Sequence, residues 1–504
     1  MGAVAVAVRE GRVRVRVDAV LVALGVLVGL AAVLRFATLS NQSFWIDESL
    51  TAHRTTGSFY DMLAAVYRPA EAEPPLYFFL VWPWARVFGR DEFGLRSLSA
   101  VFGVLTVPVA FAIGKTLVNR WVGLVVAAFV AVSPVMIWFS QEARSYALFI
   151  LLSAVSFLFF VRLLESPRAF NYVGWSVASS LALVTHYFAL FPLIGEAAWV
   201  LWRWRSRETL LAVGGIGVTG LAISPIALYQ KRHGATSWLP ATPFGRRLHW
   251  VGQEFVTGVE HPTHDLTLAV GIVCVCAVAL VIASGRSRPR YAATVGLAVA
   301  AVAIGIPLLG TAVGQDYFFA RYLLAAWISL AVAVASIVAV PRWSAAGFVV
   351  AALICGAFLY YDHAIATTKR LQRDDWRHIP RVLGRPNQPR AVVITPWWQE
   401  KPLSWYEPCL RKMPGPRVVG EVDSVVYLRS YSLVRITRQL QPGPPFRRIR
   451  RSPSWWVTVT RFRAPRPTVV SPSALLRSAP DPSAQVYFEP RRAGRAPPAG
   501  GPCR

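Results

Sequence analysis

Acidic and basic residues that could carry out chemistry stand at the edges of long apolar segments. Asp47 and Glu48 are adjacent near the beginning of the chain, and Arg144 and Arg321 follow later in short polar turns. A carboxylate can take the proton of an incoming hydroxyl group, while guanidinium groups hold a phosphate as it departs. These residue types therefore fit a reaction in which a hydroxyl group displaces a phosphate.

The same turns contain further polar residues. Charged groups are costly near a bilayer, so those between apolar segments are functional candidates. The set also includes His53, Arg96, Glu142, His186, Tyr187 and Asp316. The chain has no glycine-rich phosphate loop for a nucleotide, so a phosphate-bearing substrate outside the membrane is expected to be a lipid-linked one.

The composition indicates a membrane protein with many spans. Of the 504 residues, 55% are hydrophobic and only 16% are charged, and the mean hydropathy is +0.44. A typical globular chain has about 25% charged residues, and disorder requires low hydrophobicity. We therefore predict an all-α polytopic membrane protein with about eleven transmembrane helices. The expected spans lie near 19–34, 97–118, 121–141, 145–161, two within 169–202, 209–229, 266–285, 291–313, 322–340 and 343–361.

Positive residues favour the cytoplasmic side, and alternate loops here carry the arginines. This pattern predicts a cytoplasmic N-terminus (1–17), a transmembrane domain (18–361) and an extracytoplasmic C-terminus in the plasma (inner) membrane. The first outer loop (39–95) contains an apolar segment interrupted by prolines, Pro74–Trp84, for which we expect a helix lying in the membrane interface.

The residues after the last span predict a small α/β extracytoplasmic domain over 362–463. A helix-like stretch lies near Trp376–Leu383, and strand-like runs lie at Ala391–Thr395 and Trp455–Thr460. Residues 464–504 are rich in Pro and Arg without periodicity, so we predict a disordered tail.

The net charge of +27 does not indicate nucleic-acid binding, because no recognition motif accompanies it. The charge can instead attract anionic lipid headgroups or polymers. The five cysteines have no metal-binding spacing, although Cys409 and Cys503 could pair outside the cytoplasm. We expect no metal site, although a divalent ion at Asp47 and Glu48 stays open.

Six segments in order resemble the bacterial GT-C membrane glycosyltransferases, in the branch related to protein O-mannosyltransferases and the aminoarabinose transferase of lipid A. They are Phe44–Ser49, Glu73–Phe78, Ser140–Ala147, Thr185–Phe188, Phe319–Leu323 and Arg373–Arg377. The resemblance covers about residues 18–400 and implies a polyprenyl-phosphate sugar as donor. It also implies that the acidic pair Asp47 and Glu48 lies at or beside the catalytic position.

Each residue in the catalytic and phosphate roles has a structural alternative. Asp47 is expected to be the general base, unless it only caps the following helix. Glu48 either binds the acceptor or orients a neighbour. Arg144 and Arg321 are expected to bind the donor phosphate, unless Arg144 pairs with Glu142 or Arg321 only reaches a headgroup.

The remaining candidates are aromatic or polar residues. His186 and Tyr187 are expected at the donor phosphate, unless His186 is a satisfied histidine in a hairpin. Glu142, His53 and Tyr77 are candidates for acceptor or sugar binding. His53 also fits a structural role, and the tyrosines fit the aromatic belt of a membrane protein.

Together these features predict an inverting glycosyltransferase that moves a monosaccharide from a polyprenyl-phosphate donor to an extracytoplasmic hydroxyl. The partners expected are the lipid-linked donor, membrane lipids and a glycolipid, polysaccharide or protein acceptor. A secondary transporter or lipid flippase is the alternative, but it would commonly show internal repeats, and the two halves of the chain show no convincing repeat.

Overall fold

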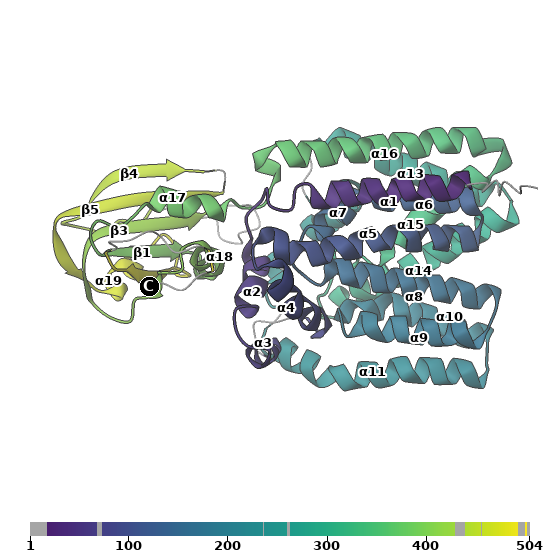
Figure 1. Ribbon diagram of the computed structural model, residues 1–504, viewed down its shortest axis with the longest axis horizontal. Coiled ribbons are helices and arrows are strands. Elements are labelled where there is room, and N and C mark those ends of the chain that lie inside the picture. Colours follow the sequence, from purple (N-terminus) through teal and green to yellow (C-terminus); the bar gives the residue numbers. More distant parts are fainter. Residues whose placement is uncertain are drawn as a thin grey trace, which may run out of the picture.

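The computed structural model describes residues 18–67, 73–234, 236–259, 263–428, 439–454, 456–491 and 499–500. Long helices lie side by side along the long axis, and a smaller domain built around a sheet stands at one end (Figure 1). Helix α1 (Ala19–Phe36) begins at the opposite end of the helical body. The predicted combination of apolar helices and a small C-terminal sheet is confirmed.

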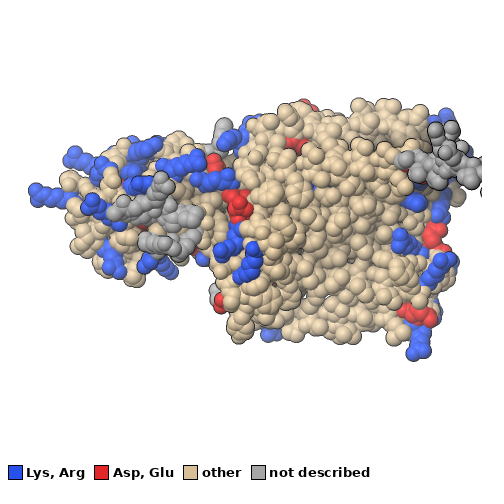
Figure 2. All heavy atoms as spheres, viewed as in Figure 1, with Lys and Arg blue, Asp and Glu red and all other residues tan. Residues whose placement is uncertain are grey.

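Within the described residues, seven helical segments are long and apolar enough to cross a membrane. They are α1, α5 (Glu92–Leu117), α8 (Tyr146–Glu165), α11 (Arg207–Arg232), α13 (His264–Ala283), α14 (Ser287–Ala312), and α16 (Ser344–Thr367) with the short turn before it. An eighth span results if α6 (Arg120–Val132) and α7 (Pro134–Ser140), bent by 56°, are taken together. Charged side chains gather mainly at the two ends of the helical body, as Figure 2 shows. The chain is therefore a multi-pass membrane protein.

Three shorter helices occupy the remaining predicted runs. They are α9 (Ala169–Leu183), α10 (Leu190–Arg203) and α15 (Ala326–Ala335). Every predicted run is thus helical, while the count of eleven spans stays a prediction. Helices α5 and α8 have 61% of their most apolar window buried, against 17% for α1 and 11% for α11. The first two are therefore central, and the outer two present apolar side chains to lipid.

The first loop folds into three helices between the helical body and the C-terminal domain (Figure 1). They are α2 (Ile46–Arg54), α3 (Phe59–Val66) and α4 (Leu76–Phe88). Ser58 and Asp61 form a capping box that begins α3. Helix α4 covers the segment for which we expected an interfacial helix, and its position in the interface stays a prediction. The second long loop contains α12 (Phe244–Thr257).

The C-terminal domain is a six-stranded sheet in the order β2-β6-β1-β3-β5-β4. The strands are β1 (Arg390–Thr395), β2 (Arg411–Lys412), β3 (Arg417–Tyr427), β4 (Arg447–Pro453), β5 (Val457–Val470) and β6 (Gln485–Glu489), and the helices are α17 (Ile379–Leu383), α18 (Glu400–Tyr406) and α19 (Pro472–Arg477). Among the strands of the described residues, β1 and β3 form the one parallel pair. The predicted strands and the predicted helix are present, and Cys409 is disulfide-bonded, whereas Cys503 lies outside the described residues.

The predicted disorder of residues 464–504 is wrong for most of that segment. It supplies the second half of β5, helix α19 and strand β6, which pairs with β1 in the middle of the sheet. The misleading residues were Pro465 and Pro467. They lie in the irregular part of β5 between its two paired stretches with β3, and beyond its pairing with β4. Proline is tolerated in a strand where no ladder hydrogen bond is needed.

One hydrophobic core joins the first loop to the C-terminal domain. Phe44 of the first loop and Phe78 of α4 belong to the same buried cluster as Trp376, Ile394 and Trp405. The rings of Phe44 and Trp405 meet edge to face with centroids 6.0 Å apart. The domain is therefore packed onto the loop that holds the acidic pair.

Candidate active site

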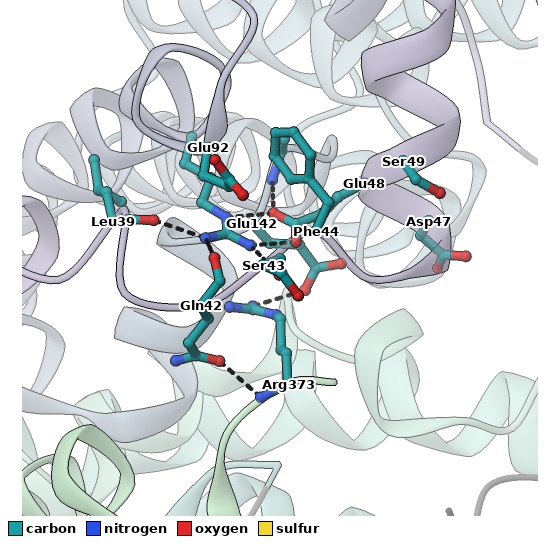
Figure 3. A network of polar contacts seen from close by, with 12 residues as sticks. Leu39, Gln42, Ser43, Phe44, Asp47, Glu48, Ser49, Glu92, Glu142 and Arg373 are labelled. Atoms are coloured by element: carbon teal, nitrogen blue, oxygen red, sulfur yellow. Dashed lines mark hydrogen bonds and ion pairs between the residues drawn. The ribbon is translucent and has the colours of Figure 1, made fainter. Parts of the chain in front are cut away.

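Helix α2 presents Asp47 and Glu48 in its first turn, where the helix dipole favours negative charge. Successive helical residues point about 100° apart, because a turn takes 3.6 residues. Figure 3 accordingly shows Asp47 projecting away from the polar network around Glu48. The residue that caps α2 is Trp45, and it makes no side-chain capping bond, so the capping alternative for Asp47 is not what the structure shows.

Glu48 is fully buried and held by Arg96 of α5. The Arg96 Nε and Nη2 atoms each donate to one Glu48 oxygen at 2.6 Å, and the Ala143 N–H donates to Oε1 at 2.9 Å. Burial by itself would raise the pKa of Glu48, but the charge and hydrogen bonds of Arg96, with the Arg373 charge and the Ala143 N–H, together lower this pKa below its ordinary value. The remaining Arg96 donors bind the carbonyls of Leu39, Gln42 and Ser43. Glu48 is thus an ionised structural anchor.

Asp47 faces a different arginine. Arg321 Nη1 lies 3.0 Å from Asp47 Oδ2, and the two side chains are 17% and 22% exposed, respectively. Aromatic rings surround the guanidinium, with centroids 5.1 Å away for Trp238, 5.5 Å for Tyr322 and 6.0 Å for Tyr146. Arg321 Nε is buried without a hydrogen-bond partner among the described residues. The pair is therefore accessible, and the arginine keeps a donor for a ligand.

His186 is buried against the ring of Phe149, with centroids 4.6 Å apart. Burial, then the charges of Arg321 and Arg144, lower the pKa of His186 to about 3. The imidazole is therefore neutral. Its Nδ1 atom accepts from the Phe188 N–H at 3.4 Å, which leaves the proton on Nε2. Both arginines therefore lie close enough to His186 to affect its charge, while their role at a donor phosphate stays a prediction.

The other charged candidates form buried ion pairs. Arg144 does not pair with Glu142, which was its structural alternative. Its Nη2 atom lies 2.7 Å from Glu73 Oε1. Glu142 pairs instead with Arg373, at 3.3 Å. Burial raises the pKa of Glu142 to about 7, although Arg373 opposes the rise.

Three predicted residues serve the scaffold. Tyr77 is fully buried, with its hydroxyl 3.4 Å from the Ser99 hydroxyl. The Tyr187 hydroxyl donates to Gln230 Oε1 at 3.0 Å. His53 Nε2 lies 3.1 Å from the Lys401 carbonyl of the C-terminal domain. These contacts tie the three side chains to the surrounding fold, and their roles at the donor or the acceptor stay predictions.

Sequence reasoning missed the role of the segment that enters the C-terminal domain. Arg373 donates through its backbone to Gln42 Oε1 at 2.8 Å, and through Nη2 to the Trp138 carbonyl at 3.1 Å. Arg377 Nη2 lies 2.7 Å from Glu92 Oε1. Figure 3 shows Arg373 reaching into the network from below Gln42. The Arg373–Arg377 motif was the sequence feature that could have indicated this role. Its partners could not be identified from the sequence because they lie more than two hundred residues earlier.

The acidic pair does not assemble a cation site. Both Glu48 oxygens bind Arg96, and Asp47 binds Arg321. Over the described part of the chain, no three His, Cys, Asp or Glu residues gather in a way that could hold a metal ion. The residues present therefore do not fit the divalent ion that the sequence left open.

Residues 72–229 match the family model described as dolichyl-phosphate-mannose-protein mannosyltransferase. The match spans α4 to α11 and contains Arg144 and His186, and it confirms the relationship to the GT-C glycosyltransferases related to protein O-mannosyltransferases. It favours a glycosyltransferase over a transporter. None of the curated proteins compared with the chain matches it.

Among solved structures, the chain is similar to the oligosaccharyltransferase of Archaeoglobus fulgidus in the apo form. The identity is 14% and the TM-score 0.45, over 72% of this chain and 57% of the other. It is also similar to ArnT from Cupriavidus metallidurans bound to undecaprenyl phosphate, with 14% identity and a TM-score of 0.39, over 87% and 97% of the two chains. The chain thus spans little more than half the length of the archaeal enzyme.

Proposed function

We propose that the protein transfers a monosaccharide from a polyprenyl-phosphate donor to an acceptor hydroxyl, with inversion at the anomeric carbon. The observation that carries the proposal is the accessible pair of Asp47 and Arg321 beside neutral His186. The matched family supports the donor class, because a dolichyl-phosphate mannose is a polyprenyl-phosphate sugar.

The donor phosphate would compete with Asp47 for Arg321. Arg321 Nε has no partner among the described residues. Its contact with Asp47 is a single one, in which Nη1 lies 3.0 Å from Oδ2. When a phosphate binds the guanidinium, the Asp47 carboxylate is released to accept a proton. The ion pair therefore keeps the base neutralised until the donor arrives.

The transfer is a single displacement. The acceptor oxygen attacks the anomeric carbon from the face opposite the phosphate, and Asp47 takes its proton. The bond between the anomeric carbon and the phosphate oxygen breaks, and its electrons leave with the polyprenyl phosphate. Arg321 would stabilise the growing negative charge, and we propose that Arg144 and the Nε2–H of His186 assist.

The site is proposed to face the outer leaflet of the plasma membrane. The arginines in alternate loops favour a cytoplasmic N-terminus. Helix α2, which carries the acidic pair, lies at the opposite end of the helical body from the beginning of α1 (Figure 1). Lipid-linked donors reach this side without a cytoplasmic nucleotide.

The test is Asp47→Asn, which keeps the shape of the side chain and removes its basicity. Transfer of radiolabelled sugar from membrane extract should be abolished while the protein still inserts and folds. Asp61→Asn, in the exposed capping box of the same loop, is the matched control and should keep full activity. Retained transfer by Asp47→Asn would remove the general base from the proposal.

A further inference from the structure

Acidic side chains contribute little to the surface of the C-terminal domain between residues 390 and 490. None of the six Asp and Glu side chains between residues 390 and 490 is exposed. The three on β3 and β6 are buried and neutralised from within: Arg390 Nε lies 2.7 Å from Glu489, Arg461 Nε 2.7 Å from Asp423 and Arg463 Nη2 2.6 Å from Glu421. Of the other three, Glu407 is buried, and Glu400 and Asp481 are only partly exposed, so positive charge dominates the surface.

The basic side chains are concentrated in one part of the chain. Residues 424–480 contain eleven arginines and no Asp, Glu or Lys. Figure 2 shows blue atoms over much of the domain and red atoms mainly near its junction with the helices. Such a surface attracts polyanions over a distance set by screening, about 8–10 Å in physiological salt.

Strand β4 is the densest part of this surface. It forms one edge of the sheet and carries four exposed arginines: Arg447, Arg448, Arg450 and Arg451. None of the four forms an ion pair within the described part of the chain. Their register partners on β5 are Arg463, Phe462, Arg461 and Thr460, so the adjacent strand supplies no acid. At about 3.3 Å per residue, the four charges extend over roughly 13 Å.

Protection of a sheet edge does not explain this pattern fully. Charged residues on edge strands prevent pairing between molecules, and arginines on β4 would serve that purpose. Edge protection requires no depletion of acids elsewhere. The absence of acids over residues 424–480 and their burial on β3 and β6 both point to a negatively charged partner.

The direction of β4 favours a polymer over a lipid surface. In Figure 1, β4 runs along the long axis of the molecule, beyond the ends of the membrane helices. Only the end of the strand near Pro453 is directed towards the helical body, so a bilayer could contact few of its arginines. An extended chain of repeated negative charges can follow the whole strand.

We infer that the β4 edge, formed by Arg447, Arg448, Arg450 and Arg451, binds an anionic envelope polymer that carries phosphates or carboxylates. Resting on the proposed function, this polymer is the acceptor, and the edge holds it at the end of the helical body where α2 lies (Figure 1). The inference assigns the acceptor to a class that the catalytic residues alone do not determine.

The experiment measures binding of the full-length protein in phosphatidylcholine nanodiscs to immobilised linear polyphosphate and to polygalacturonate, with dextran as the neutral reference. The test variant changes all four β4 arginines to glutamine. Its matched control makes the same change in charge at the opposite end, with Arg205, Arg207, Arg286 and Arg290 changed to glutamine. All eight side chains are exposed.

The β4 variant should lose about tenfold or more in affinity for both polyanions, and the slope of log affinity against log salt should become shallower by about 3, since each lost contact removes roughly 0.7. The control should bind like the wild type. Equal loss in both variants, or no loss in the β4 variant, overturns the inference. The same variants are also tested for binding to phosphatidylglycerol vesicles. If the β4 variant loses binding to these vesicles but not to the polyanions, the inference is overturned, because that result would indicate a lipid surface.

Binding and catalysis fail separately. Asp47→Asn should keep wild-type affinity for the polyanions, because α2 does not contribute to the β4 edge. If polyanion binding depends on β4 but no sugar transfer is found, the proposed function is wrong and the binding surface stands. If transfer depends on Asp47 but the β4 arginines are dispensable for polyanion binding, the proposed function stands and the inferred binding surface is wrong.

Discussion

Asp47 and Glu48 are neighbours in sequence, yet their carboxylates are bound by arginines from distant parts of the chain. Arg96 of α5 holds Glu48 in the interior, and Arg321 meets Asp47 at a partly accessible position. A pair that the sequence presents as one motif is thus divided between a fully buried ion pair and a partly exposed one.

Glu48→Gln should destabilise the protein more than Asp47→Asn does. It leaves the buried Arg96 charge uncompensated, and breaking a buried ion pair costs about 3–5 kcal/mol. Thermal unfolding in detergent should show a lowered midpoint for Glu48→Gln and a near-unchanged one for Asp47→Asn. Equal midpoints for Glu48→Gln and the wild type would contradict the anchoring role.

Arg321→Lys should weaken binding of the donor. Lysine keeps the charge but loses the planar group that lies among the aromatic rings and can bind phosphate through two donors. A charge-assisted hydrogen bond contributes about 1.5–3 kcal/mol, so KM for the donor should rise roughly tenfold or more. Steady-state kinetics with varied donor and saturating acceptor measure this, and an unchanged donor KM would argue against a phosphate contact.

Arg373→Lys should lower kcat through the position of the turn that carries Glu142. Arg390→Lys is the control, because Arg390 is an equally buried arginine of the same domain, paired away from the site. It should reduce stability without this change in kcat. A double-mutant cycle of Arg373→Lys with Glu142→Gln should give a coupling of about 0.5–3 kcal/mol. Additive effects would mean that the pair does not act together.

Stability should fall as pH rises from about 4.5 to about 7. Burial raises the pKa of Glu142 from an ordinary 4.5 to about 7, so in this window the folded protein holds a proton that the unfolded chain has lost. The contribution is full below the unfolded value and lost as pH passes the folded one. Glu142→Gln should flatten this part of the curve, measured by thermal unfolding between pH 4.5 and 8. An identical curve for the variant would assign the dependence elsewhere.

The apolar runs predicted every long helix, because a membrane helix must satisfy its backbone internally and its length is set by the bilayer. The expectation that Arg144, His186 and Arg321 lie at the same end of the helical body was also available from the sequence, because all three lie in turns between apolar runs. The partners were not. Nothing local to Arg144 indicates that it binds Glu73 rather than Glu142, because the choice depends on how distant turns pack.

The C-terminal domain was predicted less completely for a different reason. The run at Ala391–Thr395 has the β-branched residues of a buried strand. The end of β5 instead contains Pro465 and Pro467, which locally resemble an irregular tail. Their place in the irregular part of the pairing with β3 is a tertiary property that no sequence window contains.

The core that Phe44 and Phe78 share with Trp376 and Trp405 means that the two halves of this protein cannot be exchanged as modules. A chimera that receives a foreign outer domain would have to receive the matching first loop as well. Substitutions that adapt the domain to a new polymer are accordingly expected on strands outside this shared core, such as β4, where they leave the core intact.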